Sequence, residues 1–302
     1  FPVGRDDHVP SGLELAQALS RIGVRVTAFE EGRFIGGLQD PEVNGSALAI
    51  LSSEMAMHLG ARAEIDDDGD KLRVSGSSGE ARVDNVLLAM GRRPNIDDLG
   101  LENLGIGLDD HGMPSYNSDS MQVADLPVFI AGDANNDLPL LHEAIDEGHI
   151  AGYNAVHREY SCFNRRIPLA ITFTEPNIVR VGRTYRELDQ NTAFGSCDFA
   201  GQSRARMSNS NQGLLHLYAD SKEGTVLGAE MTAPAGEHMG HLISVAVQQQ
   251  MTVFEMLKLP FYHPVVEEGL RTAVRAAAKQ VDRHFREEQL LMCESAADEC
   301  IS

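Results

Sequence analysis

Apolar residues recur at helical spacing near the start of the chain and then change to an alternating pattern. Residues 12–22 place leucine and isoleucine side chains three and four positions apart, which predicts an amphipathic helix. Residues 24–29 alternate apolar and polar side chains and lead into Glu30, which predicts a strand that ends at an acidic residue. A second helix is predicted over residues 45–59.

Two later segments contain a continuous apolar run rather than an alternating pattern. The first, residues 82–88, becomes continuously apolar towards its end, and the second, residues 126–133, ends in Gly-Asp. Such runs are typical of parallel strands that are buried on both faces. Shorter strand-like pieces lie at residues 61–65 and 71–75, and a helix is expected over residues 138–158.

Beyond residue 165 the pattern changes to strands separated by glycine and asparagine turns, with helices towards the end. The strands are expected at 168–182, 196–200, 213–219 and 225–233, and the helices at 237–251 and 264–284. The order of these elements predicts an α/β region followed by a mixed α+β domain.

Length and composition narrow the class of protein. A chain of 302 residues has room for two or three domains, because a domain takes about 100–200 residues. The net charge of −20 argues against binding to nucleic acid, whose phosphates would repel the chain. No apolar run reaches the ~18–20 residues of a membrane span. Four cysteines give no disulfide framework, so a reducing cytoplasm is the expected compartment.

The first helix and strand carry part of a dinucleotide-binding motif. Gly12 opens the helix and Glu30 ends the strand eighteen residues later, where such motifs place the acid that accepts the ribose hydroxyls. Counting back from Gly12, however, Asp7 and Val9 occupy the other two glycine positions. Two interpretations stay open: a nucleotide site, or a packing turn in which Gly12 allows close contact between helix and strand.

Four further segments give the chain a specific resemblance. They read LLAMGRRPN (87–95), VFIAGDANNDLPLLHEAIDEGHIAG (128–152), FTEPNIVRVG (173–182) and FYHPVVEEGLRTA (261–273). Together with the helix at Gly12, they resemble the flavoprotein disulfide reductases, and among these the dihydrolipoamide dehydrogenases. The resemblance implies a partial Rossmann-like α/β region for FAD and NAD, followed by an α+β dimerisation domain.

The resemblance also implies roles for individual residues in cofactor binding. Asp133 would accept a hydrogen bond from the ribityl chain of FAD, and Glu30 would accept the ribose hydroxyls of NAD. The positions implied to bind a cofactor are Gly12, Glu30, Gly91, Arg92, Gly132, Asp133, Leu141 and His142. For Asp133 the competing interpretation is a helix-capping carboxylate after a strand.

His263 and Glu268 match the acid–base element of the family. There the histidine exchanges a proton with the dithiol, and the glutamate orients and polarises its imidazole. A base that works near neutral pH, with a partner for its second ring nitrogen, is what such chemistry requires. The competing interpretation is a histidine that lies beside a helix start, with the glutamate on the solvated face.

The resemblance divides the chain into a partial NAD-binding domain (1–90), a segment of the FAD-binding domain (91–160), an interface domain (161–285) and an acidic tail (286–302). It implies a homodimer formed through the interface domain. It also implies contact with an enzyme complex that carries lipoyl groups.

The elements that the family needs for catalysis are not all in the sequence. None of Cys162, Cys197, Cys293 and Cys300 belongs to a Cys-x4-Cys pair, and no flavin-binding βαβ unit precedes Gly12. The chain is therefore expected to correspond to the C-terminal two-thirds of a dihydrolipoamide dehydrogenase, inactive alone and weak in FAD binding. The alternatives are a catalytically incompetent dimerising chain, or another reductase of the mercuric, glutathione or transhydrogenase type.

Two further motifs in the sequence are weaker evidence for a functional site. Glu237, His238 and His241 form E-H-x-x-H, but the family has an ordinary interface helix there, so no metal site is expected. Cys293 and Cys300 lie in an acidic setting that disfavours reactive thiolates, so they are interpreted as incidental.

Overall fold

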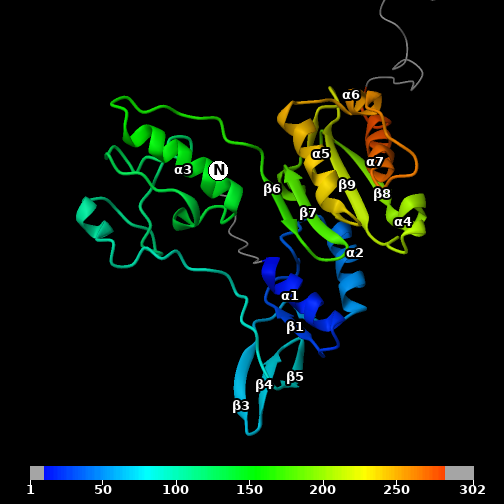
Figure 1. The fold of residues 1–302 in the computed structure, drawn as a ribbon, viewed down its shortest axis with the longest axis horizontal. Helices are drawn as coiled ribbons and strands as arrows, with labels where there is room; N and C mark the ends of the chain where they lie inside the picture. Colours follow the sequence, from blue (N-terminus) through cyan, green and yellow to red (C-terminus); the bar gives the residue numbers. More distant parts are fainter. Residues whose placement is uncertain (1–9, 283–302) are drawn as a thin grey trace, which may run out of the picture. The chain divides into compact units, whose positions relative to one another are not determined.

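The computed structural model describes residues 10–282, and their chain forms two compact units (Figure 1). One unit is Gly91–Arg166, and the other combines the residues before it with those after it. Several features named above lie outside the described residues: Asp7, Val9, Cys293, Cys300 and the acidic tail.

The first part of the larger unit alternates helices and strands. Its elements are α1 (Pro10–Arg21), β1 (Thr27–Glu30), α2 (Pro41–Ser52) and β2 (Ala56–Leu59). Strands β1 and β2 pair in parallel, with Thr27 opposite Ala56. The helix predicted over 45–59 is therefore wrong in its second half. The last four of those residues form β2 instead, and they satisfy backbone groups by pairing with β1.

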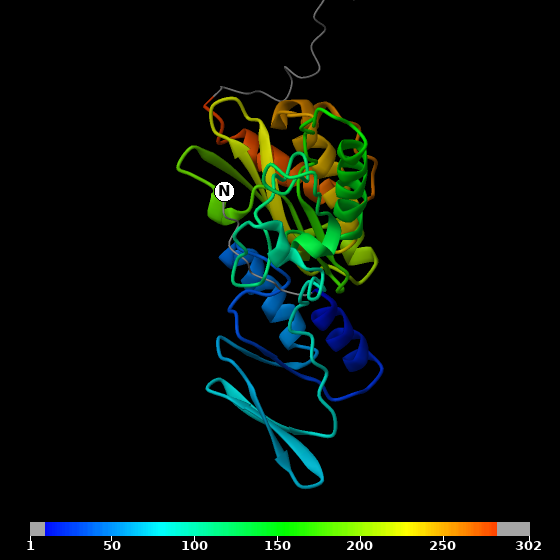
Figure 2. The ribbon, with the colours of Figure 1, turned by 90° about the vertical axis from the view of Figure 1, so that its left-hand side faces the viewer.

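A three-stranded antiparallel sheet follows, and Figure 2 shows it as a sheet of its own. Its strands are β3 (Glu64–Asp68), β4 (Lys71–Gly76) and β5 (Gly79–Val83). The parallel strand predicted over 82–88 is wrong, since β5 pairs antiparallel with β4 and ends at Val83. Leu87 and Leu88 are 58% and 62% exposed. A buried parallel strand needs partners on its edges, and the described residues provide none to 84–90.

The rest of the larger unit is a five-stranded antiparallel sheet with helices (Figure 1). The strand order is β6-β7-β10-β9-β8, and the bounds are β6 (Leu169–Thr172), β7 (Asn177–Gly182), β8 (Thr192–Asp198), β9 (Leu214–Asp220) and β10 (Val226–Ala233). The helices are α4 (Ser203–Met207), α5 (Gly236–Gln248), α6 (Val253–Lys258) and α7 (Glu268–Ala278), and short 3-10 turns lie at Tyr185–Glu187 and Phe199–Gly201.

The two faces of this sheet have different partners because side chains alternate along each strand. On one face Val179, Leu217 and Met231 pack with helices α5 and α7 in a fully buried apolar core. On the other face Ile178 packs with residues of α2 and of the loop before it. The sheet therefore joins the first part of the unit to the last.

The smaller unit contains little regular structure. Its elements are η1 (Leu101–Leu104), η2 (Gly132–Asn135) and helix α3 (Leu141–Ala155). The strand predicted over 126–133 is wrong, because Phe129 makes only an isolated bridge to Gln122. An apolar run becomes a strand only where a neighbouring strand takes up its backbone groups. Within residues 10–282, no helix has the length and apolarity that a membrane crossing requires.

Candidate functional site

His263 and Glu268 meet in the connection between α6 and α7. The Nδ1 atom of His263 lies 3.1 Å from both carboxylate oxygens of Glu268. Glu268 is the first residue of α7, where the helix dipole favours a negative charge. Glu268 lies five positions after His263 along the chain, and the turn after Pro264 brings the two side chains together.

The protonation of this pair follows from the contacts. The hydrogen bond with His263 is the main cause that lowers the pKa of Glu268, and the Val265 amide adds to it. An ionised carboxylate only accepts hydrogen bonds, so Nδ1 of His263 must carry the proton that it shares. In the neutral ring, Nε2 is then the free basic atom. The His263 side chain is 72% exposed, so that atom is open to a reaction partner.

The residues implied to hold FAD lie in the smaller unit, around the turn at Gly132. Gly132 has φ of +69°, and its amide donates a hydrogen bond of 2.6 Å to Glu147 Oε2. The same oxygen accepts from the side-chain amide of Asn135 at 2.7 Å. Glu147 is almost fully buried and therefore fixes the turn that presents Asp133.

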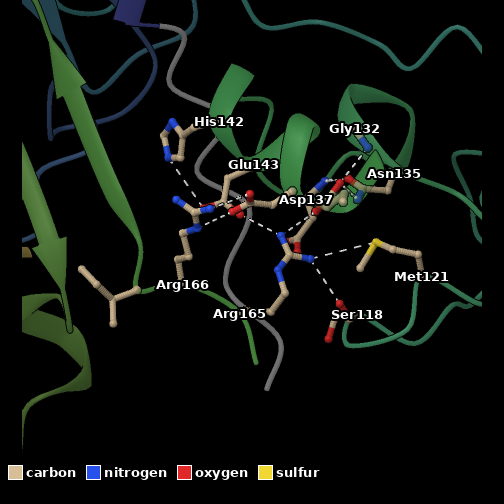
Figure 3. A network of polar contacts seen from close by, with 12 residues as sticks. Ser118, Met121, Gly132, Asn135, Asp137, His142, Glu143, Arg165 and Arg166 are labelled. Atoms are coloured by element: carbon tan, nitrogen blue, oxygen red, sulfur yellow. Dashed lines mark hydrogen bonds and ion pairs between the residues drawn. The ribbon is translucent and has the colours of Figure 1, made fainter. Parts of the chain in front are cut away.

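Arg165 supports Glu147, and sequence reasoning did not single it out. Its guanidinium lies 2.9 Å from Glu147 and 2.7 Å from Glu143, and it donates to the Ser118 carbonyl at 3.1 Å (Figure 3). Burial by itself lowers the pKa of Arg165, but the bonds to these two carboxylates raise it above its ordinary value. One arginine thus compensates two buried acids, and no sequence motif marked it.

The structure brings Arg92 and Asp133 together. Arg92 donates to Asp133 at 2.9 Å and to the Pro139 carbonyl at 3.2 Å. The preceding Gly91 has φ of +92°, a conformation that favours glycine. Arg92 and Asp133 are 62% and 51% exposed, and exposed pairs of this kind are weak. The second oxygen of Asp133 is therefore available to a ligand hydroxyl.

Leu141 and His142 begin helix α3 and point largely into solvent. Leu141 is 79% exposed. The His142 ring is 52% exposed, and its Nε2 atom lies 3.7 Å from Glu143. Both residues lie close to the Gly132 turn in the smaller unit, and their role in flavin binding stays a prediction.

Gly12 and Glu30 lie in the larger unit. A methyl group added to Gly12 would lie 3.0 Å from the side chain of Ala89, so the glycine allows close packing there. Glu30 ends β1 and accepts a hydrogen bond from the Gly32 amide at 2.9 Å. The packing interpretation of Gly12 therefore has a visible contact, while the glycine turn that would hold phosphates falls among residues 1–9.

The described residues fit parts of two cofactor sites. Asp133 is an exposed carboxylate on a glycine turn, which suits a hydroxyl-rich chain such as ribityl, and Glu30 suits a ribose. The E-H-x-x-H motif offers no comparable cluster. His241 bonds to the Glu237 carbonyl at 2.7 Å, and no group of three or more metal-ligating side chains occurs in residues 10–282.

Two family models match the chain. The model of the pyridine nucleotide-disulphide oxidoreductases matches residues 10–148, and the model of the dimerisation domain of the same enzymes matches residues 168–274. The predicted fold class, an FAD- and NAD-type region followed by a dimerisation domain, is confirmed by this order.

Curated relatives carry one recurring name. Dihydrolipoyl dehydrogenases from Sus scrofa, Thermus scotoductus and Haloferax volcanii are 30%, 29% and 27% identical to the chain. The alignments cover 88–89% of this chain and 55%, 60% and 58% of the three relatives. The chain thus spans little more than half the length of these relatives.

Solved structures show the same fold. LpdA from Mycobacterium tuberculosis is 26% identical with a TM-score of 0.74, over 88% of this chain and 59% of that one. The HOCl-induced flavoprotein disulfide reductase RclA from Escherichia coli is 23% identical with a TM-score of 0.76, over 88% and 62%. At that identity the second likeness concerns the fold alone.

Proposed function

The chain belongs to the pyridine nucleotide-disulphide oxidoreductase family, and we propose that it takes part in the NAD-linked oxidation of protein-bound dihydrolipoamide. The curated relatives named dihydrolipoyl dehydrogenase support this substrate class over others in the family. Cytoplasmic location is part of the proposal, in keeping with the free Cys162 and Cys197.

The observation that carries the proposal is the contact between His263 and Glu268. Glu268 holds Nδ1 of the ring at 3.1 Å, which leaves Nε2 as an exposed base. In the proposed reaction, Nε2 takes a proton from a thiol of dihydrolipoamide, and the thiolate is then the nucleophile. The Glu268 carboxylate stabilises the imidazolium that forms, so the proton stays on His263 until it is released.

Cofactors in this reaction would be held by residues of both units. Asp133 would accept a hydrogen bond from the ribityl chain of FAD, and the Arg92 guanidinium lies beside its other oxygen. Glu30 would accept the ribose hydroxyls of NAD. When bound, FAD passes electron pairs between a disulfide and a nicotinamide. The reaction also needs a redox disulfide, and the four cysteines of this sequence contain no Cys-x4-Cys pair to supply it.

A homodimer formed through residues 161–285 is the second part of the proposal. The dimerisation-domain match over residues 168–274 supports it, as does the complete core beneath α5 and α7. In such a dimer His263 would serve the flavin of the other subunit. Contact with a lipoyl-bearing enzyme complex follows from the substrate. Sedimentation that gives a folded monomer at micromolar concentration would contradict the dimer.

The test is a substrate panel on the protein expressed from its complete reading frame with FAD supplied. We expect bound flavin and NAD reduction that depends on dihydrolipoamide. If the protein reduces glutathione disulfide or mercuric ion and does not oxidise dihydrolipoamide, it is another reductase of the family. A dimer without flavin or activity would instead support the catalytically incompetent alternative.

A further inference from the structure

The backbone that carries His263 is fixed at one nearby residue, Val265. Pro264 has no amide hydrogen, so the first backbone donor after His263 belongs to Val265. The Val265 amide donates to Glu268 Oε2 at 3.3 Å, and the Val265 carbonyl accepts from the Gln202 side chain at 2.7 Å. Both polar groups of Val265 are therefore held by side chains.

Gln202 is itself anchored, so its amide is not free to turn. It forms the N-cap of α4, and its Oε1 atom accepts from the Ala205 amide at 2.6 Å. This contact requires oxygen on that side, so the NH2 group must face the Val265 carbonyl. The backbone N–H of Gln202 also donates to the Phe199 carbonyl at 3.1 Å, which ties this residue to the chain just after β8.

The same short stretch touches α7 on the other side of Glu268. Phe199 is fully buried, and a methyl group added to Gly269 would lie 2.7 Å from its ring. The absence of a side chain at Gly269 therefore lets the first turn of α7 lie directly on Phe199. Residues 199–202 thus contact the chain both before and after Glu268.

We propose that Gln202 is a positioning residue for His263, acting through Val265 and Glu268. The inference rests on the proposed function only in giving His263 an acid–base task. The Gln202 amide fixes the Val265 peptide, and Val265 fixes one oxygen of Glu268. That oxygen in turn orders the imidazole, so that Nδ1 keeps its proton and Nε2 stays basic.

Without the Gln202 side chain, the Val265 carbonyl, two residues after His263, loses its hydrogen-bond donor and binds water instead. Val265 is then no longer fixed, so Glu268 cannot hold the Val265 amide and the His263 ring at the same time. An imidazole that loses its carboxylate partner populates both neutral tautomers. A hydrogen bond to a charged group is stronger than one between neutral groups, so its loss changes the tautomer ratio by an observable factor.

The tautomer of His263 is the readout, measured in the full chain by NMR with ¹⁵N-labelled histidine at about pH 8.5, well above the ordinary histidine pKa of about 6.5. His263→Gln assigns the signal among the 11 histidines. In wild type we expect the Nδ1–H form. In Gln202→Leu the ratio of Nδ1–H to Nε2–H should fall about tenfold. Gln202→Glu is of equal size, still accepts from Ala205, and should cause the same fall.

Two further variants separate positioning from general loss of structure. Ser208→Ala removes a 3.1 Å bond from the Ser208 hydroxyl to the Arg204 carbonyl at the C-terminal end of α4, and should leave the tautomer ratio unchanged. In a Glu268→Ala background, Gln202→Leu should have no further effect, because the two residues act in series.

The outcomes distinguish this inference from the proposed function. An unchanged His263 tautomer in folded Gln202→Leu or Gln202→Glu overturns the positioning role and leaves the acid–base role intact. A wild-type ring without preference for Nδ1–H overturns both. Absence of dihydrolipoamide oxidation in the wild-type protein, together with the expected tautomer changes in the Gln202 variants, overturns the proposed function alone.

Discussion

Asp40 and His216 meet inside the protein although they lie 176 residues apart in sequence, with 2.7 Å between Asp40 Oδ2 and His216 Nδ1. The same oxygen accepts the Tyr218 hydroxyl at 2.9 Å, while Oδ1 caps the first turn of α2. One buried carboxylate therefore joins the start of α2 to strand β9. Glu230 on β10 reinforces the connection, since it accepts the amides of Gln39 and Asp40.

Replacement of Asp40 should destabilise the larger unit strongly. Asp40→Ala leaves the buried His216 ring and Tyr218 hydroxyl without their partner and removes the cap of α2. We therefore expect the free energy of unfolding to decrease by about 3–5 kcal/mol. Urea unfolding followed by circular dichroism measures it. Asp198→Ala is the matched control, because Asp198 is an exposed cap that bonds the Ala200 amide, and it should cost less than about 1 kcal/mol. Equal losses of stability in Asp40→Ala and Asp198→Ala would contradict the role of Asp40 in this network.

The contact between Asp40 and His216 also makes the stability of the larger unit depend on pH. Burial alone raises the pKa of Asp40, but the hydrogen bond from His216, together with the Val43 amide and the Tyr218 hydroxyl, lowers it below 3.8. A carboxyl with a lowered folded pKa adds stability above its unfolded pKa, and this stability is lost as pH falls through the folded value. The urea concentration at the unfolding midpoint should therefore decrease as the pH is lowered below about 4. In Asp40→Asn the urea midpoint should decrease less steeply with falling pH. The same pH dependence in Asp40→Asn and wild type would contradict the role of Asp40.

Removal of Arg165 should loosen the turn at Gly132. Arg165→Leu leaves Glu143 and Glu147 buried without a counter-charge, at a cost of about 3–5 kcal/mol to the smaller unit. Hydrogen exchange at the Gly132 amide, which Glu147 protects, reports the change. Arg166→Ala is the control, since Arg166 is 72% exposed in its pair with Asp146. Protection that survives in Arg165→Leu would show that Glu147 holds the turn without help.

Asp133 should matter for flavin binding, whereas its exposed pair with Arg92 should matter little for stability. Asp133→Ala removes a charged hydrogen-bond acceptor, so the Kd for FAD should rise about tenfold or more. Flavin fluorescence titration measures this. Arg92→Ala should leave the urea midpoint within error of wild type, because exposed pairs contribute little. An unchanged FAD affinity in Asp133→Ala would place the ribityl contact elsewhere.

The sequence predicted elements well where a segment satisfies its own backbone or pairs with a near neighbour. Helix α1 and the strands β9 and β10 lie close to their predicted positions. The apolar runs at 82–88 and 126–133 predicted parallel strands, but such a strand depends on distant partners that periodicity does not reveal. Helix α6 was missed although Thr252 and Glu255 form a capping box, a signal that was present in the sequence.

The candidate site was predictable only as far as its residues belong to motifs. The family resemblance picked out His263, Glu268 and Asp133, and the structure brings the first two within 3.1 Å. Gln202 and Arg165 belong to no motif. Their importance comes from partners 63 and 18 residues away, a relationship that only folding creates.

The kcat for dihydrolipoamide oxidation tests the central claim most directly. It is compared between His263→Gln and His238→Gln in the protein expressed from its complete reading frame with FAD supplied. His238 is a matched histidine on α5 with a 67% exposed side chain and a carboxylate, Glu237, at 3.7 Å. Loss of a general base lowers the rate about 10²–10⁴-fold, so His263→Gln should fall by that factor while His238→Gln keeps the wild-type kcat. Equal kcat values in the two variants would contradict the assignment of His263 as the acid–base group.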